Sequence, residues 1–189
     1  MENEGGGMIG DLWRQARPLL LADALLGYLL GAGMARYLGN TLPFDRLVYG
    51  LLWLWMVQLA AHWLYARLGE GAAPQALSPE MRLRRDAPLW GAYTALTLGA
   101  VFSVVLLQSG ALNSGSVLVM LGLLALAVAA ALPPWRLADS LYRSLLPSLA
   151  LAGLTPVWGF VLHAALPWQP VAIISLALAM LHFAAMLVF

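Results

Sequence analysis

The chain alternates long apolar stretches with short polar breaks, and the apolar stretches have the length of membrane-spanning helices. About 20 consecutive apolar residues cross the roughly 30 Å hydrocarbon core of a bilayer as a helix. Backbone groups in lipid must be hydrogen-bonded within their own segment, so each stretch is predicted to be helical. The pattern therefore predicts an all-α, polytopic transmembrane bundle with about six spans: 18–38, 47–66, 87–108, 116–132, 145–163 and 171–189.

The longest polar break after the N-terminus covers residues 67–86 and predicts a cytoplasmic loop. Ser78 followed by Pro79 is typical of a helix start, with a serine N-cap and a proline in the first turn. A short amphipathic helix with several arginines is predicted to follow: Arg82, Arg84 and Arg85. These arginines either anchor the loop to anionic lipid or receive a phosphate or an acidic partner.

The arginines are unequally divided between the two predicted membrane faces. The face opposite the N-terminus has only Arg36 and Arg46. The N-terminal face has the other eight: Arg14, Arg17, Arg67, Arg82, Arg84, Arg85, Arg136 and Arg143. Basic residues in short loops favour the cytoplasmic side, so both termini are predicted to be cytoplasmic, in a bacterial inner membrane. Residues 1–17 then form a cytoplasmic segment before one transmembrane domain, 18–189.

Composition supports this interpretation and excludes several functions. The chain is 62% hydrophobic and only 10% charged, whereas a soluble domain has about 25% charged residues. The absence of cysteine excludes disulfides, thiolate metal sites and cysteine nucleophiles. A net charge of +1 argues against nucleic acid as a partner.

A few polar side chains lie inside the predicted spans and are candidate site residues. Asp23 lies about one and a half turns into the first span, where an unpaired carboxylate is costly. It pairs with Arg17 or Arg14, lies at the level of the lipid headgroups, or lines a substrate cavity. Gln58 and His62 are four residues apart, so both point to one place on the second span. They either hydrogen-bond to each other, or His62 is a ligand to a metal or a pigment.

Small residues and a proline predict how the spans pack. Gly27 and Gly31 are four residues apart and allow another helix to approach closely. Pro156 is predicted to kink the fifth span. His182 in the sixth span is a second candidate pigment ligand. The histidines fall on different spans or their ends, and no Ser-His-Asp arrangement is predicted: His62, His163 and His182.

Several of these features, in this order, resemble the UbiA family of membrane prenyltransferases. They are Arg17-Pro18, the glycine-rich run 27–33, the long loop after the second span, Pro134-x-Arg136-Leu137, residues 154–159, and Leu181-His182-Phe183. The resemblance implies a bundle like the first six of that family's nine helices. It also implies a scaffold built to join an isoprenoid diphosphate to an aromatic or tetrapyrrole acceptor with the help of Mg²⁺.

The sequence departs from the family where that chemistry needs acidic ligands. The first family motif, N-x-x-x-D-x-x-x-D, falls in register with Gln58, His62 and Ala66, so both aspartates are absent. Ala138 replaces the basic residue that usually follows the Arg-Leu pair. The second Asp-rich motif is expected after the sixth helix, beyond the last residue. A divalent ion takes a shell of oxygen ligands, which the scattered acids of the loop do not provide: Glu70, Glu80 and Asp86.

We therefore predict a non-catalytic, UbiA-like structural or accessory subunit of a larger photosynthetic or respiratory membrane complex. Its expected partners are the lipid bilayer and other integral membrane subunits. Its expected ligands are apolar tails of quinone, carotenoid, chlorophyll or lipid. Alternatives are a residual prenyltransferase whose missing helices come from another chain, and a lipid or quinone carrier that works alone. The candidate cavity-lining residues are Asp23, Gln58, His62, Arg136 and His182.

Overall fold

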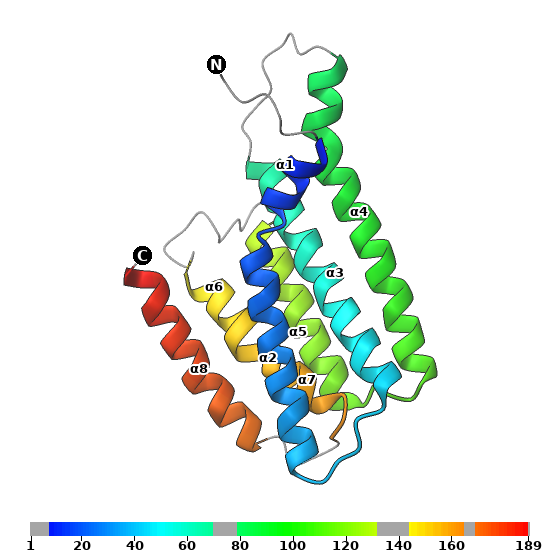
Figure 1. Ribbon diagram of the computed structural model, residues 1–189, viewed down its shortest axis with the longest axis vertical. Coiled ribbons are helices and arrows are strands. Elements are labelled where there is room, and N and C mark those ends of the chain that lie inside the picture. The colour runs from blue at the N-terminus through cyan, green and yellow to red at the C-terminus, as the bar shows by residue number, and fades with distance from the viewer. Residues whose placement is uncertain (1–7, 70–78, 132–143, 165–168, 189) are drawn as a thin grey trace.

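The computed structural model describes residues 8–69, 79–131, 144–164 and 169–188, and all regular structure in these ranges is helical (Figure 1). The long helices are α2 (Pro18–Tyr37), α3 (Phe44–Gly69), α4 (Pro79–Gln108), α5 (Ser114–Ala131) and α8 (Gln169–Val188). A short helix, α1 (Met8–Gln15), precedes them. A segment in three pieces lies between α5 and α8: α6 (Leu145–Pro147), the π-helix η2 (Ser148–Leu154) and α7 (Thr155–Val161).

Several of these helices have the length and composition of membrane spans. Within the described ranges five qualify, namely α2, most of α3 and α4, α5 and α8. The fifth predicted span corresponds to Leu145–Val161, which is apolar but shorter than the others. The prediction of an all-helical chain with several helices able to cross a membrane is therefore confirmed, and the structure supports five full-length spans rather than six.

The irregular segment has a local cause in the sequence. Pro156 has no backbone N–H to donate to the preceding turn. The backbone N–H of Thr155 bonds to the carbonyl of Ala150, five residues back, and the Thr155 hydroxyl donates to the same oxygen at 2.8 Å. This wider π-type turn directly precedes Pro156, where we predicted that the proline would kink the span.

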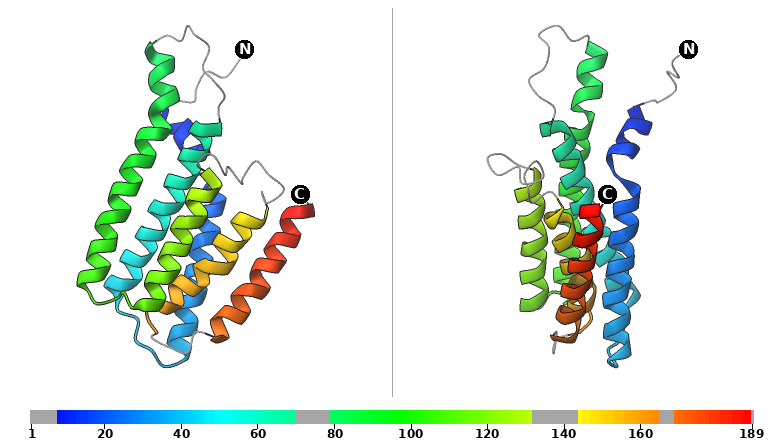
Figure 2. Two further views of the ribbon diagram at one scale, coloured as in Figure 1. Left: turned by 180° about the vertical axis from the view of Figure 1, so that it is seen from behind. Right: turned by 90° about the vertical axis from the view of Figure 1, so that its left-hand side faces the viewer.

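One prediction about the cytoplasmic loop is wrong. We expected a short amphipathic helix followed by a separate span, but α4 continues without a break from the arginine-rich part through Pro88. The polar end of α4 extends beyond the rest of the bundle (Figures 1 and 2). Its charged residues can therefore be exposed to water while the chain remains helical. Arg67 donates from Nε and a terminal nitrogen to Oδ1 of Asp86, at 3.0 and 2.9 Å, and this ion pair joins α3 to α4.

A direct backbone contact joins α2 to α7. A Cβ atom added to Gly31 would overlap the Pro156 carbonyl, and one added to Gly159 would overlap the Tyr28 carbonyl. The two backbones therefore touch where α2 crosses α7. This confirms the close approach that we predicted from Gly27 and Gly31.

Two tryptophans fill the core beside this crossing. The rings of Trp53 and Trp158 lie 4.7 Å apart between centroids, and both side chains are buried. Trp158 donates to the Gly50 carbonyl at 3.1 Å, and Trp53 donates to the Ser103 hydroxyl at 2.9 Å. Both indole N–H groups are thus satisfied inside the apolar core, and the two bonds join α7 to α3 and α3 to α4.

The η2–α7 segment lies in the middle of a flat bundle. Seen from the side in Figure 2, α2 and α5 lie on opposite sides of it. Both α2 and α5 pack against η2 and α7, and α8 packs along η2. Because η2 has neighbours on both sides, it contributes residues to two different cavities.

Candidate functional site

The larger cavity is a groove between α2 and α8, which we call the α2–α8 groove. Its volume is about 410 Å³. Leu151, Ala152 and Pro156 form its floor. The two walls are mostly leucine, with one carboxylate from α2 and one imidazole from α8: Asp23, Leu26 and Leu30, facing Leu178, Leu181 and His182.

The two polar residues of the groove are hydrogen-bonded to each other and to η2. Oδ2 of Asp23 lies 3.2 Å from Nε2 of His182. Nδ1 of His182 lies 2.9 Å from Oγ of Ser148, and this hydroxyl donates to the Ser144 carbonyl at 2.7 Å. A chain of hydrogen bonds thus leads from the groove into the helix behind it.

This arrangement corrects two sequence-based expectations. Asp23 pairs with His182, not with Arg17 or Arg14 as we proposed for a paired carboxylate. A serine, a histidine and an aspartate also lie together, although we predicted no such arrangement. They come from three segments far apart in the chain, and the packing of both α2 and α8 on η2 brings them together. Ser148 was not a candidate, because one serine in an apolar helix carries no signal.

The order of the three groups differs from that of a hydrolase. A nucleophilic serine must reach the substrate while the carboxylate stays behind the histidine. Here Ser148 is 1% exposed and lies behind His182, whereas the side chain of Asp23 is 45% exposed in the groove. The groups that this chain of hydrogen bonds offers to a ligand are therefore the oxygens of the carboxylate.

The second cavity lies on the other side of η2, among α2, α3, α5 and η2. Its volume is about 110 Å³, and both Gln58 and His62 line it. Nε2 of His62 is buried and has no hydrogen-bond partner, so the predicted Gln58–His62 hydrogen bond is not formed at this atom. The two residues do share one cavity, as their spacing indicates.

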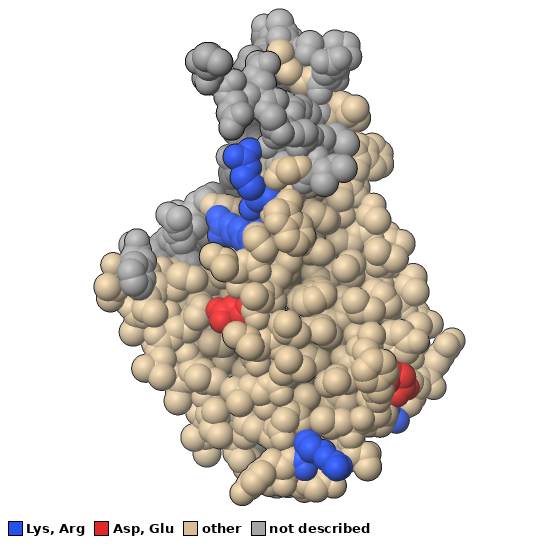
Figure 3. All heavy atoms as spheres, viewed as in Figure 1, with Lys and Arg blue, Asp and Glu red and all other residues tan. Residues whose placement is uncertain are grey.

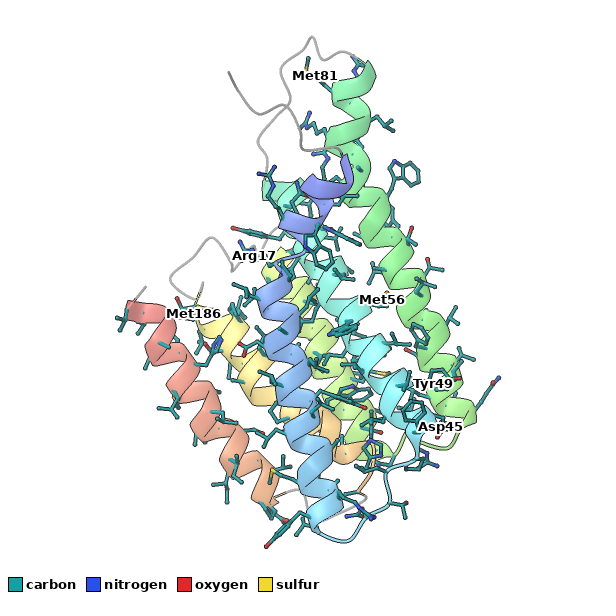
Figure 4. All side chains as sticks on the ribbon, viewed as in Figure 1. Arg17, Asp45, Tyr49, Met56, Met81 and Met186 are labelled. Carbon is teal, nitrogen blue, oxygen red and sulfur yellow. The ribbon has the colours of Figure 1, made fainter. Side chains whose placement is uncertain are left out.

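Arg17 lies at the junction of α1 and α2 and also lines this second cavity (Figure 4). Its backbone has φ 49° and ψ 69°, in the left-handed region that non-glycine residues rarely adopt. Such a conformation costs about 1–2 kcal/mol. The rigid Pro18 follows it and begins α2, so the chain bends at Arg17 between α1 and α2, and Arg17 lines the cavity.

The remaining predicted residues are Arg136 and the acids of the polar segment 67–86. Arg136 lies outside the described residues, as does Glu70. Asp86 pairs with Arg67, away from both cavities. Among the residues that the structure describes, no three histidine, aspartate or glutamate side chains are grouped so that they could hold a metal ion.

Comparisons with models of protein families, with characterised proteins and with solved structures find no match to this chain. Any function must therefore be argued from the two cavities themselves. Of these, the α2–α8 groove is the larger, and its walls continue the outer surface of the bundle. Figure 3 shows that this surface is broadly neutral, with arginine side chains toward its ends and a small acidic patch within it.

Proposed function

We propose that this chain is a non-catalytic integral membrane protein that holds the apolar tail of an isoprenoid or lipid in the α2–α8 groove. The observation that carries this proposal is the groove itself. Its volume of about 410 Å³ lies within the range of small-molecule sites, about 300–1,000 Å³. Leu26 and Leu181 on its walls are 65% and 68% exposed, so an apolar chain would cover leucine from both sides.

The chemistry around the second cavity supports a binding role over catalysis. In the UbiA-like register, the positions of the two aspartates are held by His62 and Ala66. An imidazole and a methyl group do not bind the Mg²⁺ that a diphosphate leaving group requires. The proposal therefore keeps a UbiA-like scaffold without its reaction. Mg²⁺-dependent transfer of a labelled isoprenoid by the purified chain, lost in a His62→Ala variant, would overturn it.

The proposal includes a setting in the membrane. The distribution of arginines supports a bacterial inner-membrane protein with both termini cytoplasmic, and Leu145–Val161 then makes a sixth, shorter crossing. Leucine and valine side chains exposed on α5 and α8 give other subunits a surface to pack on, for example Leu118 and Leu121, and Leu187 and Val188. An accessory subunit of a photosynthetic or respiratory complex fits this description, with quinone, carotenoid or chlorophyll tails as the ligands.

Filling the groove tests the proposed function. Ala185 lines the groove on α8, and Ala185→Trp would occupy the space of a bound tail. The matched control is Ala100→Trp, at an exposed position of α4 outside the groove. Mass spectrometry of lipids extracted from each purified protein should show a tail-bearing molecule bound to the wild type and the control, and several-fold less of it on Ala185→Trp. Equal amounts on all three proteins, or none on any, would refute the proposal.

A further inference from the structure

We propose that the α2–α8 groove selects ligands whose polar end donates an O–H hydrogen bond, and that Asp23 is the residue that accepts it. This inference rests on the proposed function, because it adds a head-group preference to a groove that holds a tail. The matching ligands are amphiphiles with one apolar chain and a hydroxyl head, either isoprenoid alcohols or reduced, hydroxyl-bearing quinones.

The first step of the argument is the placement of protons. The Ser148 hydroxyl has one proton, and the 2.7 Å contact with the Ser144 carbonyl takes it. Oγ of Ser148 then accepts from Nδ1–H of His182, 2.9 Å away. The 3.2 Å contact between Nε2 and Asp23 needs one further proton, shared between the ring and the carboxyl group. The pair then has no net charge, whether it is an imidazolium with a carboxylate or an imidazole with a carboxylic acid.

The second step is that the groove-facing atoms of Asp23 are acceptors in each of these states. If the proton lies on the ring, the carboxylate has only lone pairs to offer. If it lies on Oδ2, that O–H points at His182 and the other oxygen is still an acceptor. The oxygens of Asp23 are also acceptors if the Ser148 hydroxyl instead donates to Nδ1 of His182. The ring proton then lies on Nε2, and Nε2–H donates to the carboxylate. Since the side chain is 45% exposed, a ligand in the groove meets an acceptor and must supply a donor.

The third step concerns which donor fits. Asp23 lies five residues after Pro18, which places it roughly 8 Å along the axis of α2 at a rise of about 1.5 Å per residue. If the ammonium group of a lipid bound to Asp23 at this depth, the charged phosphate of the same lipid would be drawn into the hydrocarbon. That burial has a high cost in free energy. A hydroxyl head carries no charge, so it can donate to Asp23 without bringing a second charged group into the hydrocarbon. The leucines on both walls of the groove then pack against the apolar tail of the ligand.

The experiment compares pairs of closely similar ligands, of which one has an O–H donor at its polar end and the other has none. The full chain in nanodiscs is titrated with tritiated geranylgeraniol and with its methyl ether, and with a prenylated hydroquinone and the corresponding quinone. We expect each hydroxyl ligand to bind at least tenfold more tightly than its partner without a donor, the effect of one hydrogen bond to a charged or strongly polarised group. Binding of only one hydroxyl class would identify the source of the ligand.

The variant Asp23→Leu should bind all four compounds with nearly equal affinity, because it keeps an apolar wall and removes the acceptor. Equal binding of alcohol and ether to the wild type would overturn this inference and leave the proposed function standing. If no compound binds at all, this inference fails, and the lipid extraction from Ala185→Trp decides the proposed function separately. The wild-type comparison decides the question even if Asp23→Leu does not fold.

A second measurement asks whether another polypeptide fills the groove instead. The chain has no cysteine, so Leu26→Cys places a single thiol on the exposed wall of the groove. A photoactivatable maleimide attached there should cross-link to lipid-like molecules in native membranes. Cross-linking to a protein chain, with none to lipid, would overturn the inference.

Discussion

The backbone contact between α2 and α7 makes a sharp prediction for a one-carbon change, Gly31→Ala. The nearest atoms to an added Cβ are the carbonyl carbon and oxygen of Pro156 and the backbone nitrogen of Phe160. None of these atoms can rotate away, as the end of a side chain could. The added methyl group can be accommodated only if the two helices move apart.

The size of the effect follows from three contributions. Forcing a methyl group into a closely packed contact costs up to about 3 kcal/mol. Separation of α2 from its neighbours also weakens the 2.9 Å hydrogen bond from the Tyr28 hydroxyl to the Leu47 carbonyl, worth about 1 kcal/mol. The higher helix propensity of alanine returns about 1 kcal/mol. We therefore expect Gly31→Ala to lower the free energy of unfolding by up to about 3 kcal/mol.

Gly33 provides the matched control, because it lies in the same helix and has no atom within 4 Å of an added Cβ. Gly33→Ala should raise the free energy of unfolding by up to about 1 kcal/mol, from helix propensity alone. The assay is reversible unfolding in mixed detergent and SDS micelles, followed by the fluorescence of the chain's eight tryptophans. If Gly31→Ala is as stable as Gly33→Ala, the α2–α7 crossing is not part of the native structure.

Two further substitutions test other contacts. Trp158→Phe should cost about 2–3 kcal/mol in the same assay, since it removes the indole hydrogen bond to the Gly50 carbonyl and leaves a gap beside Trp53. A loss below 0.5 kcal/mol, a rough threshold for an incidental contact, would contradict the packing described here. The pair between Arg67 and Asp86 is 22% and 44% exposed, so a double-mutant cycle with Arg67→Gln and Asp86→Asn should give a coupling energy below about 1 kcal/mol that falls with added salt. A larger, salt-independent coupling would show that this pair lies in a drier setting than the structure indicates.

The candidate site shows how far single residues could be assigned from the sequence. Asp23 and His182 were candidates because polar groups inside apolar spans are costly and need a reason to be there. Their partnership was not predictable, because 159 residues separate them and no periodicity links α2 to α8. For Gln58 and His62 the outcome differs, since four residues of helix place two side chains on one face whatever the rest of the fold does. Their shared cavity could therefore be predicted, and the unpaired nitrogen of His62 could not.

The sequence by itself determined that the chain is helical, that several helices can cross a membrane, and that glycines on α2 meet another backbone. These properties depend on hydrophobicity, on hydrogen bonding within a segment and on the size of a side chain, all of which are local. Tertiary structure alone decided that α2 crosses α7, that α8 stands against η2, and that Asp23 bonds to His182 across a groove. In a chain this apolar, many helix faces can pack on one another with similar energy. The choice among them depends on close contacts such as that between Gly31 and Pro156, which only the folded chain makes.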